Sequence, residues 1–207
     1  MHMIAVFLAA LAALLPITNP LGGVAAYAGL SARLDATERR RQAWRTGLYV
    51  AAILVAFTLV GTYILELFGI SLPALQIAGG LVVMQSGYGM VVPRRVVSKD
   101  ERADTATKPD ISFSPMALPL IAGPGAIGVV IGLAARNPTL GDRLAIVAAV
   151  LALSVVIAVC LRFGTPLTEK LGATGVGAIT RIMGFLILAI GVELLIHGLA
   201  AALPGLA

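Results

Sequence analysis

Residues 16–23, PITNPLGG, lie in the middle of an uncharged, strongly apolar run that covers residues 1–32. The two prolines of this stretch are four positions apart, and each removes a backbone N–H donor and clashes with the preceding helical turn. Its two glycines weaken the helix further, because glycine loses more conformational freedom on folding than any other residue. We therefore predict an apolar helix that is interrupted close to Asn19.

The whole chain is as apolar as this run. Of its 207 residues, 59% are hydrophobic and 12% are charged, and the mean hydropathy is +0.99. Soluble domains carry charges at roughly a quarter of their positions, so the composition excludes a soluble globular protein. A helix needs about 20 apolar residues to cross a bilayer core of about 30 Å. Six uncharged runs can each hold one such helix: residues 1–32, 46–65, 67–93, 111–135, 144–161 and 182–207, the last interrupted only by Glu193. We expect an all-α polytopic membrane protein with six transmembrane helices.

The basic residues are concentrated in two segments. Fifteen Lys and Arg against ten Asp and Glu give a net charge of +5, and ten of the fifteen lie in residues 33–45 and 94–108. Positive charge collects in the cytoplasmic loops of membrane proteins. We therefore expect both segments in the cytoplasm and both chain termini outside it. Since the membrane accounts for this charge, we expect no nucleic-acid partner.

A second interruption lies in the fourth apolar run, where Pro115 and Pro119 precede the sequence AGPGA at residues 122–126. Unpaired backbone groups are not tolerated against lipid, so both interruptions should face protein or a water-filled cavity. We predict that the first and fourth transmembrane helices are discontinuous. A simple proline kink is the alternative for each, and two kinks at corresponding positions disfavour it.

The two interruptions belong to a series of matches between the halves of the chain. Three pairs of segments match in order at offsets of 104 or 105 residues: 19–22 with 123–126, 38–39 with 142–143, and 76–81 with 181–186. We infer an internal duplication, with a first three-helix repeat at 1–92, a cytoplasmic linker at 93–112 and a second repeat at 113–207. Three spans are an odd number, so the second repeat enters the membrane from the opposite side and the repeats are inverted. Inverted repeats recur in secondary transporters, whose substrates bind near the membrane midplane.

An interrupted helix offers a substrate two kinds of backbone group. Free N–H groups lie at the start of one half-helix and free C=O groups at the end of the other, with partial charges of opposite sign. The carboxylate of a zwitterionic amino acid can bind the first and its ammonium group the second. The candidate substrate-binding residues are Thr18, Asn19, Pro20, Leu21, Gly22, Gly23, Ala122, Gly123, Pro124, Gly125 and Ala126. Their small Gly and Ala members leave little room for a substrate side chain.

The end of the chain carries two further patterns. Glycines at positions 177, 184, 191 and 198 are seven residues apart, which predicts a stripe for close helix packing. Arg181 lies on this stripe, as either a gate or carboxylate partner near the cytoplasmic mouth or an arginine that reaches the membrane interface. Glu193 and His197 lie on the opposite face, as either a proton relay or an interfacial pair.

Five short segments stand out along the chain: Asn19-Pro20-Leu21-Gly22, Phe68-Gly69-Ile70-Ser71, Ile77-Ala78-Gly79-Gly80, PLIAGPGA at residues 119–126, and Arg181-Ile182-Met183-Gly184. Together they resemble the MarC family of bacterial and archaeal inner-membrane proteins, over nearly the whole chain. That family includes the SnatA-type transporters of small neutral amino acids and is related to the LysE exporter superfamily. The resemblance implies six spans in two inverted repeats in a bacterial plasma membrane, with glycine or alanine as substrate. The family motif positions map onto Asn19, Pro20, Gly22, Gly123, Pro124 and Gly125.

We predict a secondary transporter that works by alternating access and binds glycine or alanine at the two interruptions. Its partners are the substrate, the lipid bilayer and a coupling ion, left open between proton and sodium. The sequence contains no nucleotide-binding loop, no zinc-ligand spacing and no nucleophile with a matching base, so we expect no enzyme activity, cofactor or metal. The alternatives are a channel or pore, an exporter of another small solute, and a non-transporting membrane scaffold. The oligomeric state is open.

Overall fold

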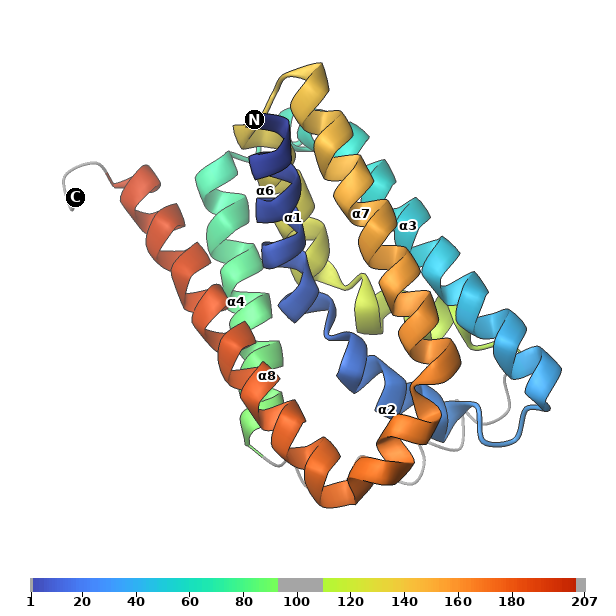
Figure 1. The fold of residues 1–207 in the computed structure, drawn as a ribbon. Coiled ribbons are helices and arrows are strands. Elements are labelled where there is room, and N and C mark those ends of the chain that lie inside the picture. The colour runs from blue at the N-terminus through green and yellow to red at the C-terminus, as the bar shows by residue number, and fades with distance from the viewer. Residues whose placement is uncertain (1, 93–109, 204–207) are drawn as a thin grey trace.

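The computed structural model describes residues 2–92 and 110–203, and within these ranges it is helical apart from short connections and has no β-strand. Figure 1 shows a bundle of mostly long helices. In chain order, the elements are α1 (His2–Thr18), α2 (Pro20–Leu30), α3 (Ala36–Leu67), α4 (Leu72–Val91), η1 (Ser112–Ile121), α6 (Pro124–Arg136), α7 (Leu140–Phe163) and α8 (Thr165–Ala202).

Short polar side chains set where several of these helices begin. The side chains of Asp35, Ser71 and Thr139 each accept a hydrogen bond from the N–H of a residue two or three positions further along the chain. These bonds satisfy donors that the first turns of α3, α4 and α7 would otherwise leave unpaired. The long helices therefore start at local sequence signals.

Both predicted interruptions are present. α1 ends at Thr18, Asn19 adopts the left-handed backbone conformation with φ 42°, and α2 begins at Pro20. In the second half, η1 has non-helical backbone at Ser114 and Leu118, each of which precedes a proline. The chain bends by 63° between η1 and α6. The first and fourth predicted membrane helices are therefore discontinuous.

Four segments of the described chain are long and apolar enough to cross a membrane, and the bent pair of η1 and α6 is a fifth. The four segments are His2–Leu30, Ala36–Leu67, Leu140–Phe163 and Thr174–Ala202. α4 has 20 residues but is not among them, since its two glutamines, its serine and its glycines reduce its hydropathy. The structure thus supports a polytopic membrane protein with four to five spans, and six spans remain a prediction.

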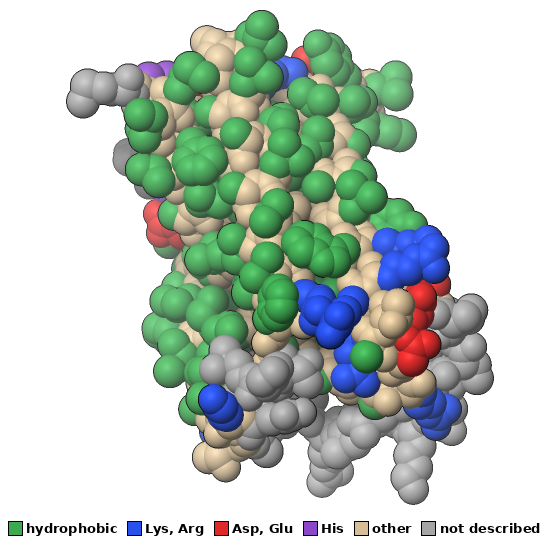
Figure 2. Space-filling model, turned by 45° about the vertical axis from the view of Figure 1, so that its right-hand side comes forward, with side chains coloured by type: hydrophobic (Ala, Val, Ile, Leu, Met, Phe, Trp, Pro, Cys, Tyr) green, Lys and Arg blue, Asp and Glu red, His purple; other side chains and the backbone are tan. Residues whose placement is uncertain are grey.

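The outer surface of the bundle is apolar. Large hydrophobic side chains cover much of the face seen in Figure 2, and most of the charged side chains in that view gather in its lower half. Leu48 on α3 and Phe185 on α8, for example, are 67% and 64% exposed. An apolar surface of this extent suits contact with lipid rather than water.

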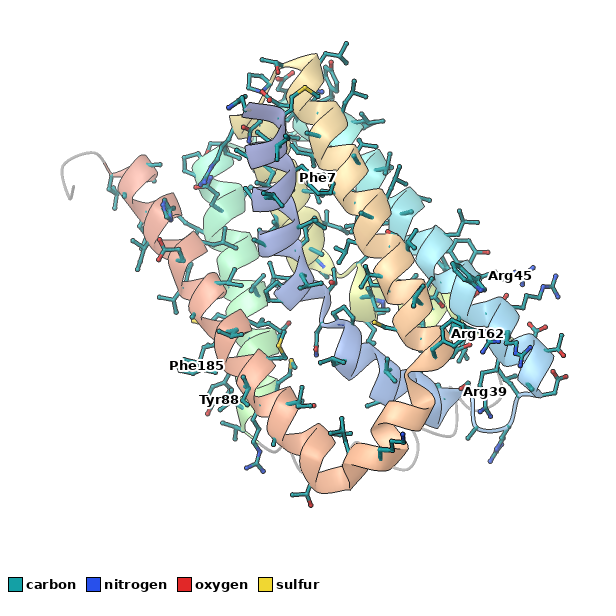
Figure 3. The ribbon with its side chains drawn as sticks, in the orientation of Figure 1. Phe7, Arg39, Arg45, Tyr88, Arg162 and Phe185 are labelled. Atoms are coloured by element: carbon teal, nitrogen blue, oxygen red, sulfur yellow. The ribbon has the colours of Figure 1, made fainter. Side chains whose placement is uncertain are left out.

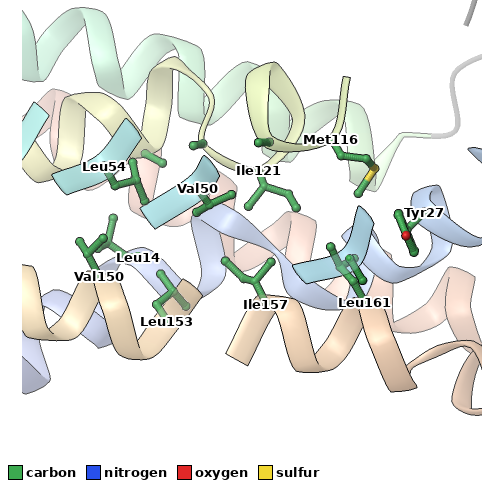
Figure 4. Packing of buried hydrophobic residues seen from close by; sticks show 14 of the residues in the cluster. Leu14, Tyr27, Val50, Leu54, Met116, Ile121, Val150, Leu153, Ile157 and Leu161 are labelled. Atoms are coloured by element: carbon green, nitrogen blue, oxygen red, sulfur yellow. The ribbon is translucent and has the colours of Figure 1, made fainter. Parts of the chain in front are cut away.

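The core joins the two halves of the chain. Leu14 of α1 and Leu54 of α3 pack in one cluster with Ile121 of η1 and with Val150 and Ile157 of α7, all of them essentially fully buried (Figure 4). Figure 1 shows α3 and α7 side by side over much of their length. The interrupted segments are therefore held against long, continuous helices.

α4 and α8 pack closely because glycines on each helix face the backbone of the other. A Cβ atom added at Gly87 would lie 2.7 Å from the carbonyl oxygen of Gly184, and one at Gly80 would lie 2.8 Å from that of Gly191. Of the stripe predicted at Gly177, Gly184, Gly191 and Gly198, the last three glycines have the expected packing role, whereas no atom lies within 4 Å of a Cβ added at Gly177. We call this contact the α4–α8 seam, formed by Gly80, Gly87, Gly184, Gly191 and Gly198.

The two interrupted segments run in opposite directions. In Figure 1, α1 and α2 descend from the end marked N, whereas α6 rises toward that end. α8 also ends in the upper part of this view. The predicted linker at 93–112 lies largely outside the described residues, and the boundaries of the two repeats stay predictions.

Candidate functional site

The two interruptions line one cavity of about 420 Å³, which we call the central cavity. Eight of the eleven predicted binding residues line it: Thr18, Asn19, Gly22, Gly23, Gly123, Pro124, Gly125 and Ala126. Residues separated by about one hundred positions in the sequence therefore share a single space. Of the described residues that line it, none has an ionisable side chain.

The polar groups of Asn19 form hydrogen bonds to both helices at the first interruption. Its Oδ1 accepts a hydrogen bond from the N–H of Gly22 at 3.1 Å, and its N–H donates to the carbonyl oxygens of Leu15 and Pro16. Its Nδ2 lies 3.7 Å from the Sδ of Met90 on α4. Asparagine tolerates the left-handed conformation better than most residues. The side-chain amide that we expected to face a substrate thus caps α2 and contacts α4.

Thr18 is also engaged within the protein. Its side chain is buried, and its Oγ1 donates a hydrogen bond to the carbonyl oxygen of Leu14 at 3.0 Å. A threonine hydroxyl often bonds in this way to the carbonyl four residues earlier in a helix. The hydroxyl is therefore satisfied by its own helix.

The start of α6 lacks a side-chain cap. Gly123 precedes the helix in an extended conformation and offers no capping side chain, and Pro124 has no N–H. The first N–H groups, those of Gly125 and Ala126, therefore form a partially positive end without a side-chain partner. A Cβ at Gly123 would lie 2.4 Å from the carbonyl oxygen of Pro119, so the close approach of η1 requires glycine there.

The wall opposite the interruptions comes from α4 and α8, and sequence reasoning missed it. Ser86 and Met90 of α4 and Thr180 and Ile187 of α8 line the central cavity. The hydroxyls of Ser86 and Thr180 each donate to the carbonyl four residues earlier, at 2.9 and 2.8 Å. Each hydroxyl oxygen can still accept a hydrogen bond. A serine on an otherwise apolar helix face, four residues before Met90, is the sequence signal that could have identified this wall.

Three predicted binding residues lie outside the central cavity. Pro20 and Ala122 are buried elsewhere, and Leu21 lines a separate apolar pocket between α2, α7 and α8. Arg181 is exposed on α8 and lines neither space, although its neighbour Thr180 lines both. Its predicted role as a gate or carboxylate partner stays a prediction.

Glu193 and His197 form a pair on the outer face of α8. The Nδ1 of His197 lies 3.3 Å from the Oε1 of Glu193, and the two side chains are 53% and 65% exposed. Neither residue lines the central cavity. Their proposed part in a proton relay therefore has no contact with the central cavity in this structure and stays a prediction.

A basic cluster marks one end of the molecule. Figure 3 shows Arg39, Arg45 and Arg162 on the same side, near the ends of α3 and α7. The Nη1 of Arg45 lies 2.9 Å from the Oδ2 of Asp110. Partial burial opposes ionisation of Asp110, but hydrogen bonds from Ser112 and the charge of Arg45 outweigh it and lower the pKa of the Asp110 carboxyl group. This ion pair holds the start of η1 against α3.

The central cavity suits a polar solute without net charge. The N–H groups at the start of α6 suit a carboxylate, and the hydroxyl oxygens of Ser86 and Thr180 can accept from an ammonium group. Burying an unpaired net charge is costly, and the described lining residues supply no countercharge. Within the described chain, no group of three or more His, Cys, Asp and Glu side chains could hold a metal ion.

Known proteins similar to this chain define its family. The model described as "MarC family integral membrane protein" matches residues 4–203. An inner membrane protein MarC of Salmonella paratyphi B is 36% identical over 201 residues, and one of Escherichia coli strain K12 is 35% identical over 202, with 91% of both chains covered in each pair. No solved structure is significantly similar. The chain therefore belongs to the MarC family of integral membrane proteins and is a multi-pass inner membrane protein.

Proposed function

We propose that this chain is a secondary transporter of small neutral amino acids, with glycine and alanine as its substrates. One observation carries the proposal: two helix interruptions from opposite halves of the chain line a single cavity, and no described residue that lines it has an ionisable side chain. Its volume, about 420 Å³, falls within the roughly 300–1,000 Å³ of small-molecule sites.

In the proposed complex, the substrate carboxylate binds the N–H groups of Gly125 and Ala126 at the start of α6. The ammonium group lies toward the opposite wall, where the hydroxyl oxygens of Ser86 and Thr180 accept its hydrogen bonds. The zwitterion has no net charge, so the uncharged lining is compatible with its burial. The methyl group of alanine contacts apolar lining side chains such as those of Val82 and Ile187.

Transport in this proposal follows alternating access between two inverted three-helix repeats that span the membrane six times. The opposite directions of the two interrupted segments in Figure 1 support this arrangement. So does the location of the cavity between the interruptions, which is where inverted-repeat transporters bind their substrates. The proposal includes no enzyme activity. The coupling ion is a proton or sodium.

Counterflow of labelled glycine and alanine into proteoliposomes tests the transport function. Saturable counterflow is expected from the wild-type protein, and imposed proton and sodium gradients then identify the coupling ion. Gly23→Val is expected to reduce uptake by at least about tenfold, because Gly23 lines the central cavity and an added Cβ already lies 3.7 Å from Ile121.

The matched control is Gly29→Val on the same helix, where no atom lies within 4 Å of an added Cβ and the residue is exposed. This variant should transport at the wild-type rate. A single-channel current in place of counterflow would contradict a carrier mechanism and indicate a channel. Normal uptake by Gly23→Val would remove the central cavity as the binding site.

A further inference from the structure

A second cavity lies beyond the central cavity and is built from the same helices. Its volume is about 130 Å³, and its lining residues come from α1, α4, α6 and α8. We call it the Arg136 cavity, because Arg136 at the end of α6 and Gln76 on α4 supply its polar groups. α6 ends in the upper part of Figure 1, on the side where α1 begins.

The two cavities are stacked along the bundle. On each helix, a residue of the Arg136 cavity is three or four positions from one of the central cavity: Ala13 and Ile17, Gly79 and Val83, Val129 and Gly125, Ile190 and Ile187. This spacing is about one helical turn, a rise of roughly 5.4 Å. The cavities are therefore consecutive spaces along one direction through the protein.

A thin apolar contact separates them. The side chain of Val83 packs against the backbone of α6, so a Cβ added at Gly125 would lie 2.6 Å from its Cγ2 and 3.7 Å from the Cγ2 of Ile17. Val83 is only 2% exposed. Because one side of this partition is the side chain of Val83, rotation of that side chain can change its width.

The Arg136 cavity differs from the central cavity in charge. Gln76 is buried, and with its amide oxygen turned toward α6 it accepts hydrogen bonds from the Nη2 and Nε of Arg136 at 2.6 and 3.2 Å. A guanidinium group has five N–H donors and matches a carboxylate in a bidentate manner. Gln76 therefore orients the guanidinium and leaves donors for a ligand.

We propose that the Arg136 cavity is the second end of the transport path, where Arg136 binds the substrate carboxylate before or after it occupies the central cavity. The contact of Val83 with α6 at Gly125 is the barrier between the two sites. This inference rests on the proposed function and adds to it a specificity-determining cation at one end of the path. A single guanidinium at the entrance selects solutes with a carboxylate, whereas the central cavity selects those without net charge.

Kinetics from both sides of the membrane test the role of Arg136. The KM for glycine is measured in whole cells and in inside-out vesicles for the wild type, Arg136→Gln and Arg136→Lys, with Arg41→Gln at the opposite end as control. Arg136→Gln should raise KM about tenfold on one side only, the loss expected for a charge-assisted hydrogen bond. Arg136→Lys keeps the charge, so its KM should lie between those of Arg136→Gln and the wild type.

Glycinamide, which lacks the carboxylate, supplies the chemical control. The wild type should prefer glycine to glycinamide as a competitor on the Arg136 side. Arg136→Gln should reduce that preference without abolishing it, because glycinamide also carries a net positive charge, which the uncharged lining of the central cavity disfavours. Unchanged KM values in Arg136→Gln, with an active wild type, would overturn this inference and leave the proposed function standing. If the wild type transports glycine from neither side of the membrane, both this inference and the proposed function are wrong.

A pair of substitutions tests the barrier. Gly125→Ala should block transport because its methyl group meets Val83, and Gly125→Ala with Val83→Ala should restore it. Thermal unfolding in detergent establishes that each variant is folded. Failure of the double variant to recover transport, although it is as stable as Val83→Ala alone, would show that the Val83 contact is not the barrier.

Discussion

At the scale of single residues, Asn19 determines the geometry of the first interruption. Its backbone is left-handed, its side-chain oxygen caps α2 and its amide nitrogen contacts Met90 on α4. A proline on its C-terminal side disfavours helical backbone at this position. The break between α1 and α2 is thus specified by the local sequence, and the side chain of Asn19 connects it to α4.

Replacements of Asn19 separate the contribution of its side-chain cap from that of its left-handed backbone conformation. Asn19→Ala should destabilise the protein by about 1–2 kcal/mol, since it removes the cap and places a Cβ without a polar partner in the left-handed region. Asn19→Gly keeps that backbone conformation accessible and should cost less. Thermal unfolding of the purified proteins in detergent measures both, and equal losses would mean that the backbone conformation contributes nothing.

At the scale of helices, the α4–α8 seam holds the wall that carries Ser86 and Thr180. The seam brings backbone within van der Waals distance of backbone, an arrangement that only small residues allow. The wall lies opposite the interruptions because of this contact, which involves none of the polar groups of the cavity. Packing and binding are therefore separable by mutation.

Two glycines of α8 allow a matched comparison. A Cβ at Gly191 would lie 2.5 Å from the backbone nitrogen of Met84, whereas no atom lies within 4 Å of a Cβ at Gly177. Gly191→Ala should destabilise the protein by about 1–3 kcal/mol through overpacking against a rigid backbone. Gly177→Ala should be neutral or stabilising by up to about 1 kcal/mol, because alanine has the higher helix propensity. Denaturation curves of the two variants measure the free energy of unfolding. Similar losses of stability for both would contradict the packing role of Gly191 in the α4–α8 seam.

At the scale of the whole molecule, the basic cluster at one end predicts an orientation in the membrane. Ten of the fifteen basic residues lie in two segments, residues 33–45 and 94–108, and the first of these contains Arg39 and Arg45 (Figure 3). From the positive-inside rule we predict that this end lies in the cytoplasm. The start of α1 and the loop before α7 lie at the other end (Figure 1).

Cysteine labelling tests this orientation. Cys160 is the only cysteine of the chain, so Cys160→Ser provides a background in which single cysteines can be placed. Leu140→Cys, at the 75% exposed first residue of α7, should react with a membrane-impermeant maleimide in intact cells. Arg41→Cys should react only after permeabilisation. The reverse pattern would place both termini in the cytoplasm.

The sequence by itself determined the features that depend on neighbouring residues. Apolar runs of membrane length predicted helices, and the prolines and glycines around Asn19 and Gly123 predicted where two of them break. The spacing of Gly177, Gly184, Gly191 and Gly198 predicted a packing stripe, which the structure confirms for the last three. Each of these follows from backbone sterics over a few residues, which no distant contact has to supply.

Only the tertiary structure decided which groups meet. It brought Ser86 and Thr180 to the wall opposite the breaks, left Arg181 on the outside of α8, and joined Gln76 to Arg136 one helical turn beyond the cavity. It also used the amide of Asn19 inside the protein. These outcomes depend on how helix faces pack against one another, and in a chain whose faces are nearly all apolar, periodicity does not reveal which face turns inward.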